Sequence, residues 1–346
     1  MLRRIVVAVQ FHGANEGRVM LVRMIFAVLL LAFAAGSVTA QSADAAAGWP
    51  ARPIKLIVPF PAGSSTDVIG RILAQSLAER LGQPVVIENR AGGSGMLGSE
   101  TVAHARPDGY TLGIATTSTH ALAPSLSASL AYNPPHDFAP VSMIGGSPYV
   151  MVTSPQLGTA RVQEFVELAK AKPGKLTFGS AGPGSLAHLA GVLFANMAGI
   201  DIVHVPYKSS GQSATDIMSG RLDMQLATIP PTLPLIQNKQ LRALATTGPK
   251  RTSALPDLPT VAESGYSGYE AVLWMALVAP ASVPQPIVAK LNDAIRKSLE
   301  DADVKRSLTI QGFEAEPDTP EALRDRIAAD IGKWRTVVAK AGIQPE

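Results

Sequence analysis

The sequence predicts an α/β fold in two lobes, with a mainly parallel sheet in each lobe. Three observations lead to this fold class. Short apolar segments alternate with amphipathic helical segments along the chain, as in βαβ units. A strand that runs through small residues into a helix occurs twice, near residues 60 and 180. A late apolar segment, residues 274–278, is placed to return the chain to the first block.

The first block, residues 49–146, opens with an apolar strand at 54–59 and an amphipathic helix at 68–81. Because the following strands also alternate with helices, we expect a mostly parallel sheet with helices on both faces. The further elements expected in this block are a strand at 85–88, a Gly-rich loop at 89–98, a helix at 101–105 and a strand at 111–115.

The chain crosses into a second block, residues 147–270, at a Gly/Ser/Pro break between strand-like runs at 141–145 and 149–153. Residues 271–346 then return to the first lobe and end in two helices, each of which begins at a proline. The elements expected in the second block are helices at 161–172, 186–198 and 214–219 and strands at 176–178, 202–206, 224–227 and 241–246.

Residues 1–40 are expected to be a signal peptide that is removed on export. Residues 24–35 form an apolar run that is followed by small residues, and cleavage is expected after Ala40. The run is too short to span a bilayer comfortably, although a retained membrane anchor is the alternative. A start at Met20 or Met24 would give a more ordinary leader. The protein is therefore expected to be exported.

Composition excludes several classes of function. The whole chain carries 30 basic and 27 acidic side chains, of which four arginines and one glutamate belong to the leader, leaving 26 of each. A nucleic-acid partner therefore lacks its electrostatic attraction. The absence of cysteine excludes disulfides and thiolate metal sites. A hydrophobic fraction of 47% can supply the core of two domains without disulfides.

The two strand–loop–helix units share a chemistry that suits a carboxylate. The first loop is Ala62-Gly-Ser-Ser-Thr-Asp67, and the second is Gly179-Ser-Ala-Gly-Pro-Gly-Ser185. A helix start reached through small residues offers unpaired N–H groups and the positive end of the helix dipole. We therefore expect main-chain ligand contacts at both loops. The expected contacts are Ala62, Gly63, Ser64, Ser65, Ser180, Gly184 and Ser185.

Five further candidates each have a structural alternative. Asp67 either contacts the ligand or, like Thr66, caps the helix that follows. Asn89 either contacts the ligand or braces its turn. Thr117 and Ser118 follow the third strand, where their hydroxyls would line the site or sit in a solvated loop. Tyr207 ends a strand of the second lobe, where its ring either contacts the ligand or packs against the protein.

Motifs that would indicate a cofactor or catalysis are weak. Gly93-Ser-Gly-Met-Leu-Gly98 matches a dinucleotide fingerprint, but no acidic residue ends the next strand, so we expect only a close approach of backbone. Ser185 and His188 lie three apart without a nucleophile elbow, so we predict no catalytic residue. The histidines lack metal-ligand spacing, and His188 and His204 are expected to be structural. We predict no cofactor and no metal.

Blocks of residues in this order resemble the receptors of the tripartite tricarboxylate transporters, also called the Bug family. The resemblance covers Trp49 to the C-terminus. It is carried by Trp49-Pro-Ala-Arg-Pro-Ile-Lys-Leu-Ile-Val-Pro-Phe-Pro-Ala-Gly63, Gly82-Gln-Pro-Val-Val-Ile-Glu-Asn-Arg90, Pro107-Asp-Gly-Tyr-Thr111, His188-Leu-Ala-Gly191, His204-Val-Pro-Tyr-Lys208 and Ala254-Leu-Pro-Asp-Leu-Pro-Thr-Val-Ala-Glu263.

The resemblance implies a periplasmic solute receptor whose two lobes close on a small carboxylate. It also implies delivery of the ligand to a membrane permease of one large and one small subunit. Ligands of the family are held by amides and waters in the loops at residues 62–65 and 180–185. Ser64 and Ser65 stand where the family commonly has glycine, which leaves the identity of the carboxylate open.

We therefore expect a type II periplasmic-binding-protein fold, a Venus flytrap. Lobe 1 is expected to comprise 49–146 and 271–346, and lobe 2 to comprise 147–270. Closure by population shift is the expected mechanism, in a protein that acts as a monomer. Two alternatives remain at this point: an exported α/β enzyme that acts on a carboxylate, and a sensor that reports ligand binding to a signalling partner.

Overall fold

The computed structural model describes residues 48–180, 182–207 and 210–345. Pro50–Glu346 forms one compact unit, and the description below concerns this unit alone. The predicted leader, residues 1–40, lies outside the described residues. Within the part of the chain that is described, none of the helices has the length and apolar character needed to cross a membrane.

The N-terminal part is built from the expected βαβ units. β1 (Ile54–Val58) lies between β2 (Val85–Asn89) and β3 (Thr111–Thr116) and pairs in parallel with both. The connections are α2 (Ser65–Leu81) after β1, and η1 (Gly93–Gly95) with α3 (Met96–Ala103) after β2. The α/β class predicted from the alternation of segments is confirmed.

The sheet as a whole is mixed, because two long strands run against their neighbours. β9 (Val272–Pro280) pairs antiparallel with β3 and with the first part of β4 (Phe138–Thr153). The structure thus corrects the expectation of a mainly parallel sheet, because β9 runs antiparallel to both of its neighbours. A strand buried on both faces reads as a continuous apolar run whichever way it points, so the sequence pattern carried no information on direction.

β4 changes partners along its length. Up to Pro148 it pairs with β9, and from Tyr149 it pairs with β7 (Met224–Thr228) and β8 (Arg242–Thr246). The two strand-like runs expected around the Gly/Ser/Pro break are therefore one continuous strand with register irregularities. The predicted lobe boundary, 146/147, lies beside this change of partner, and the division into lobes stays a prediction.

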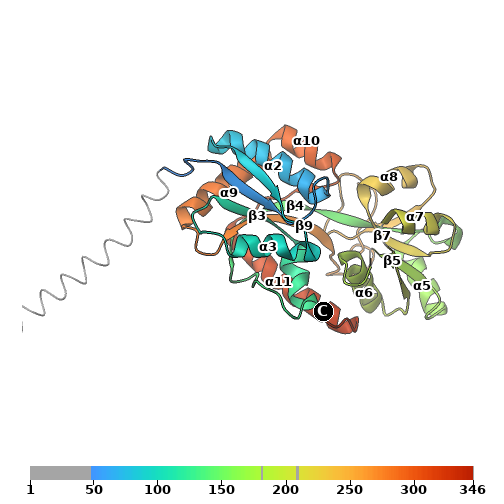
Figure 1. Cartoon of the computed structure of the whole chain (residues 1–346). Coiled ribbons are helices and arrows are strands. Elements are labelled where there is room, and N and C mark those ends of the chain that lie inside the picture. The colour runs from blue at the N-terminus through green and yellow to red at the C-terminus, as the bar shows by residue number, and fades with distance from the viewer. Residues whose placement is uncertain (1–47, 181, 208–209, 346) are drawn as a thin grey trace, which may run out of the picture. The chain divides into compact units, whose positions relative to one another are not determined.

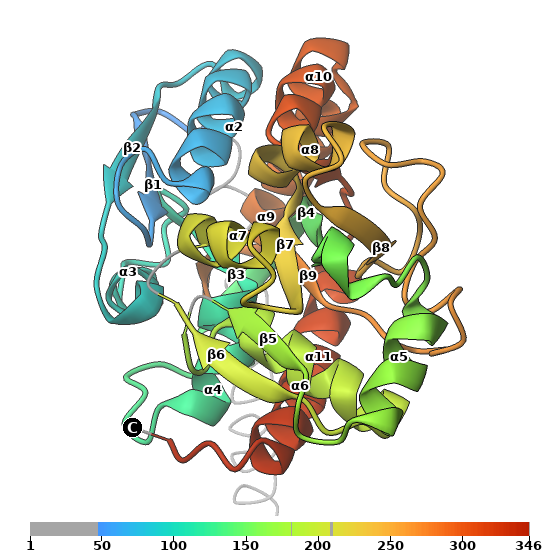
Figure 2. The ribbon, with the colours of Figure 1, turned by 90° about the vertical axis from the view of Figure 1, so that its right-hand side faces the viewer.

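The second part repeats the parallel arrangement. β5 (Thr177–Ser180) pairs in parallel with β6 (Val203–Pro206) and with β7. Helices cover both sides of these strands: α5 and α6 lie on one side, and α7 and α8 lie on the other (Figures 1 and 2). The bounds of these helices are α5 Val162–Ala171, α6 Leu186–Ala198, α7 Ser210–Met218 and α8 Ile229–Gln237.

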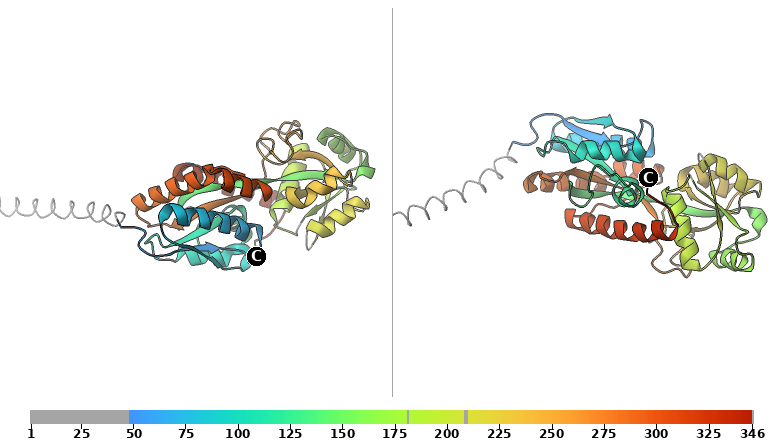
Figure 3. Two further views of the ribbon diagram at one scale, coloured as in Figure 1. Left: turned by 90° about the horizontal axis from the view of Figure 1, so that it is seen from above. Right: turned by 60° about the horizontal axis from the view of Figure 1, so that its bottom comes forward.

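The C-terminal segment returns to the first part, as expected. Its helices, orange to red in Figure 3, lie beside the blue and teal N-terminal elements, and α9 and α10 contact α2. The remaining elements are η2 Thr117–Leu122, α4 Ala123–Leu126, η3 Pro155–Leu157, α9 Gln285–Glu300, α10 Ala302–Ile310, β10 Glu314–Ala315 and α11 Pro320–Lys340.

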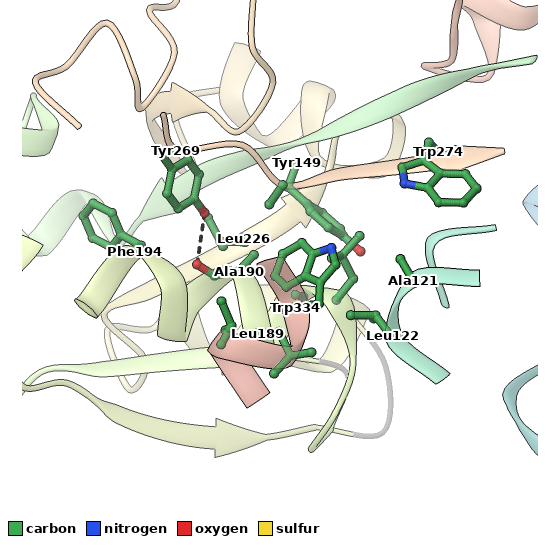
Figure 4. Packing of buried hydrophobic residues seen from close by; sticks show 14 of the residues in the cluster. Ala121, Leu122, Tyr149, Leu189, Ala190, Phe194, Leu226, Tyr269, Trp274 and Trp334 are labelled. Atoms are coloured by element: carbon green, nitrogen blue, oxygen red, sulfur yellow. Dashed lines mark hydrogen bonds between the residues drawn. The ribbon is translucent and has the colours of Figure 1, made fainter. Parts of the chain in front are cut away.

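A large apolar cluster connects the two parts of the unit. Trp274 of β9 is fully buried, and its indole N–H donates to Asp330 Oδ2 of α11 at 2.7 Å. Figure 4 shows Trp274 and Trp334 in the same cluster as α6 residues and Tyr269, whose hydroxyl donates to Ala190 O at 3.0 Å. The helices α6 and α11 thus contact each other within this apolar cluster.

Candidate functional site

The first loop leads into α2 earlier than expected. Ser64 is the N-cap, and its hydroxyl accepts a hydrogen bond from the Asp67 N–H at 3.3 Å. The structure corrects the prediction that Asp67 or Thr66 is the cap. Four consecutive residues here, Ser64 to Asp67, are all good N-cap types, so composition alone could not choose among them. Ser65 and Thr66 form the first turn.

Asp67 faces inward and braces the loop. Its side chain is 3% exposed, and Oδ2 accepts from the main-chain N–H of Gly63 and from Arg71 Nε, both at 2.9 Å. The hydrogen bond from Arg71 is the main cause that lowers the pKa of Asp67 from 3.8 to about 2, and the Gly63 N–H adds to it. Asp67 is therefore ionised, and the Gly63 N–H is already occupied.

Asn89 completes this network from the end of β2. Its Nδ2 donates to Asp67 Oδ1 at 2.9 Å and to Phe60 O at 3.0 Å, and its Oδ1 accepts from Arg71 at 3.4 Å. Both hydrogens of the amide group are thus used within the protein. Of the two roles left open by the sequence, this geometry supports the brace.

The second loop has the same design. Ser185 is the N-cap of α6, and its hydroxyl accepts from the His188 N–H at 3.2 Å and donates to Gly182 O at 2.7 Å. The N–H of Gly184 donates to His188 Nδ1 at 3.2 Å. Gly63 and Gly184 both have positive φ, of 80° and 73°, which glycine adopts without strain.

Two stacked histidines support the second loop. The rings of His188 and His204 lie 3.9 Å apart, and His204 Nε2 lies 2.7 Å from the hydroxyl of Ser180 at the end of β5. Burial, with a smaller effect of His204, lowers the pKa of His188 from 6.5 to about 4, and burial also lowers the pKa of His204. Both rings are therefore neutral at pH 7, and their structural role follows from these contacts.

The first turns of α2 and α6 present equivalent main-chain donors. In each helix the third N–H is capped by the serine, whereas the first two N–H groups have no acceptor among the described residues. These groups belong to Ser65 and Thr66 in α2 and to Leu186 and Ala187 in α6. They are four donors at the positive ends of two helix dipoles, which suits an anion.

The segment of η2 and α4 lies close to η1 and to the second loop. A Cβ on Gly95 would lie 2.7 Å from Thr119 Cγ2 and 3.1 Å from Phe60 Cζ, so Phe60, η1 and η2 meet there without room for a side chain. A Cβ on Gly184 would lie 3.4 Å from Leu126 Cδ1 of α4. The second loop therefore lies beside the chain segment that follows β3.

The remaining predicted residues differ in whether their side chains are free to meet a ligand. Thr117 is fully buried, and its hydroxyl donates to Val272 O and accepts from the Trp274 N–H, so the structure gives its side chain a role in β9 packing. Ser118 is partly exposed, and its hydroxyl has no partner among the described residues. The hydroxyl of Tyr207 donates to Asp216 Oδ2 at 3.0 Å, which supports packing.

The Gly-rich motif that resembles a dinucleotide fingerprint serves close packing. A Cβ on Gly98 would lie 2.7 Å from Pro59 Cα and 2.8 Å from Arg90 O. The helix α3 thus approaches the end of β1 as closely as backbone allows. Residues 48–180, 182–207 and 210–345 contain no cluster of three or more His, Asp or Glu that could hold a metal ion.

One hollow of the described unit lies elsewhere. It has a volume of about 610 Å³ and is lined mostly by residues of α8, β8 and the 254–258 segment, and no predicted site residue lines it. The candidate site is a set of main-chain donors. Sequence reasoning found both loops and missed Arg71, although the i,i+4 spacing of Arg71 from Asp67 was a usable signal.

Comparison with known proteins decides the family. Residues 69–343 match the model described as "Tripartite tricarboxylate transporter family receptor". The chain belongs to this receptor family. Protein BugT of Bordetella pertussis is 38% identical to this family member over 321 residues, which cover 92% of the chain and 98% of BugT.

Solved structures support the same assignment to the receptor family. A protein of R. palustris solved with adipate is 35% identical, with a TM-score of 0.71, and the match covers 86% of this chain and 100% of that one. MatC from Rhodopseudomonas palustris, solved with bound malate, is 32% identical, with a TM-score of 0.67 and coverages of 84% and 100%. The resemblance identified from sequence blocks is confirmed.

Proposed function

We propose that this receptor captures a small carboxylate at the first turns of α2 and α6 and delivers it to a membrane permease. The observation that carries the proposal is the matched pair of helix N-termini, each with a serine cap and two N–H groups that have no acceptor among the described residues. Relatives solved with adipate and with malate support a carboxylate as the ligand class.

Main-chain donors alone suffice for useful affinity. A hydrogen bond to a charged group contributes about 1.5–3 kcal/mol. Four such bonds, one for each free N–H, are of the order of the roughly 8 kcal/mol that a micromolar complex needs. No arginine is required, and Arg71 is already paired with Asp67.

The proposed mechanism is closure of two lobes, 49–146 with 271–346 and 147–270. A carboxylate that bonds to both helices at once does so only when the lobes are shut, and therefore stabilises the closed form. We propose Ser65 and Ser118, with the amide of Ala62, as further contacts. The N–H groups of Ser64 and Ser185 already donate to Pro61 O and Gly182 O, at 3.2 and 3.3 Å, so these two residues are proposed to act as helix caps. Asp67, Asn89, Ser180 and Gly184 are proposed to hold the loops in place.

A thermal-shift screen of residues 41–346 against small acids tests the ligand class. Bound ligand stabilises the folded state by RT ln(1 + [L]/Kd), about 2.7 kcal/mol at a concentration 100 times Kd. We expect malate, adipate or a related acid to raise Tm, and sugars or amines to leave it unchanged. A rise with neutral compounds alone would contradict the proposal.

A matched pair of variants tests the second helix start. Gly184→Asp places a negative charge beside the proposed anion site and should abolish binding of an acid. Gly184→Asn has the same shape without the charge, and Asn also tolerates positive φ. We expect Gly184→Asn to keep much of the affinity. Equal affinities of the two variants for an acid would remove this loop from the site.

Export, the permease and the monomeric state are part of the proposal. We propose that residues 1–40 are removed after Ala40 and that the receptor acts in the periplasm with a permease of one large and one small subunit. N-terminal sequencing of protein from a periplasmic extract tests the cleavage. A size-exclusion experiment on the same protein, where a dimer would contradict the proposal, tests the monomer.

A further inference from the structure

The turn before α6 donates a hydrogen bond to a side chain of that helix. Gly184 has a φ of 73°, and its N–H donates to His188 Nδ1, four residues further along the chain, at 3.2 Å. The serine cap that follows orients the first turn of α6. Besides the hydrogen bonds among Ser180, Gly182 and Ser185, the turn therefore uses an acceptor that a side chain of α6 provides.

This hydrogen bond requires one tautomer of His188. A main-chain N–H can only donate, so Nδ1 must be unprotonated and the ring hydrogen must lie on Nε2. A charged imidazole carries hydrogens on both nitrogens. The Nδ1–H and the Gly184 N–H would then face each other, and the turn could not keep its present geometry.

Neighbouring strands hold His188 where it can accept this bond. Its ring stacks on His204 of β6 at 3.9 Å and lies parallel to Phe178 of β5, with centroids 6.2 Å apart. His204 in turn lies 2.7 Å from the hydroxyl of Ser180, which accepts from the Gly182 N–H at 3.1 Å. The ring contacts and the turn are thus connected through both strands.

We propose that His188 is a positioning residue that holds the Gly184–Ser185 turn in its ligand-binding conformation through an unprotonated Nδ1. The proposal rests on the proposed function, because it concerns the conformation in which the α6 amides meet a carboxylate. In the first loop Asp67 Oδ2 accepts the corresponding hydrogen bond from the Gly63 N–H, at 2.9 Å. The acceptor in the first loop is thus an ionised carboxylate, and the acceptor in the second loop is a neutral imidazole.

The surroundings of His188 favour the neutral ring. His204 is the titratable group in ring contact with it, and their proximity disfavours a charge on either ring. The elements packed against α6 also include η2, which carries the buried His120, and α11, where Asp330 and Lys333 pair with each other at 2.8 Å. β5 and β7 contribute no titratable side chain.

Two substitutions separate the acceptor from the ring. Asn Oδ1 occupies nearly the same position as His Nδ1, so His188→Asn keeps the acceptor without a titrating group. His188→Leu removes the acceptor and retains an apolar side chain. At pH 7.5 we expect His188→Leu to bind malate and adipate about tenfold more weakly than wild type, and His188→Asn to recover most of this loss.

Affinity as a function of pH gives a readout that a purely structural residue would not change. The ratio of wild-type affinity to His188→Asn affinity cancels the protonation of the ligand itself. We expect this ratio to fall as the pH decreases towards about 4, where His188 becomes charged. A constant ratio, or full affinity in a folded His188→Leu, would overturn the proposal.

A ligand-free measurement keeps this proposal distinct from the proposed function. In ¹H–¹⁵N spectra of deuterated protein, the Gly184 amide of wild type should shift with the titration of His188, and that of His188→Asn should not. If neither acid binds wild type, the proposed function fails while this titration still decides the role of His188. A Gly184 resonance that ignores the His188 titration contradicts that role.

Discussion

The main-chain N–H of Gly63 donates to the carboxylate of Asp67, four residues further along the chain, at 2.9 Å. Gly184 and His188 have the same spacing and the same bond in the second loop. In both loops a side chain of the first helical turn fixes a glycine with positive φ just before the serine cap. The capping residues thus set the direction of the amides that are left for a ligand.

Asp67→Asn should destabilise the protein at pH 7 by about 1–2 kcal/mol. The loss is smaller than the pKa shift alone implies, because solvent around the exposed Arg71 weakens the ion pair. The native pKa of Asp67 is lowered to about 2, so the native carboxylate stays ionised while the unfolded one, near 3.8, takes up a proton. The stabilisation is therefore complete above pH 4 and is lost as the pH falls towards 2. Urea denaturation from pH 7 to pH 2.5 measures this.

The control for Asp67 is Asp303, an exposed carboxylate that pairs with Arg306 on α10. Its side chain is 81% exposed, so Asp303→Asn should change the free energy of unfolding by less than about 0.5 kcal/mol. If the difference between wild type and Asp67→Asn were the same at pH 7 and pH 2.5, the ion pair would not be its source.

Gly98→Ala and Gly332→Ala should change stability in opposite directions. A Cβ on Gly98 would meet Pro59 Cα and Arg90 O at 2.7 and 2.8 Å, and backbone cannot easily move away, so we expect a loss of about 1–3 kcal/mol. On Gly332 of α11 a Cβ meets nothing within 4 Å, so alanine should stabilise the helix by about 0.5–1 kcal/mol. Thermal unfolding of both variants gives the signs.

Local patterns were enough to predict most of the elements. The helix expected at 186–198 has the bounds of α6, because Ser185 caps it and Gly199 ends it in a left-handed conformation. α8 was not predicted, since three of its nine residues are prolines, a composition that argues against a helix. The direction of β9 depends on its partners, which no local pattern contains.

The features of the candidate site likewise divide into those that a local pattern predicts and those that depend on distant residues. Both loops were located because small residues before a helix are visible in the chain itself, although α2 begins at Ser65 and was expected from residue 68. A structural role was expected for His188 and His204, but their partners were not predicted, because the contact of His204 with Ser180 joins residues that are 24 positions apart. The burial of Thr117 against β9 likewise depends on a strand more than 150 residues away. Sequence reasoning therefore found the two loops, but of the four donor residues it named only Ser65 as a ligand contact.

Trp274→Phe should destabilise the protein by about 2–4 kcal/mol. The substitution leaves a cavity beside α11 and removes the N–H that donates to Asp330 Oδ2 at 2.7 Å. A double-mutant cycle with Asp330→Asn measures the part due to this bond, for which we expect a coupling of about 0.5–3 kcal/mol. Additive effects in urea denaturation would show that the loss comes from packing alone.

His120→Phe should flatten the dependence of stability on pH between about 6.5 and 5. His120 is 1% exposed, its Nε2 has no partner among the described residues, and burial lowers its pKa to about 3. The native ring stays neutral while the unfolded ring takes up a proton below pH 6.5. Wild type should therefore lose about 2 kcal/mol of stability between pH 6.5 and 5 through this residue.

The ring of His120 packs 4.5 Å from that of Phe138, so phenylalanine keeps an aromatic side chain in the cluster. His188 and His204 titrate in both proteins, and the difference between the two stability curves isolates His120. A constant offset would reflect packing of the larger ring and loss of the hydrogen bond between His120 Nδ1 and Thr119 Oγ1, at 2.9 Å, whereas a slope reflects the proton. Urea denaturation of both proteins at pH 5 to 7 measures the two effects, and parallel curves would contradict a neutral buried His120.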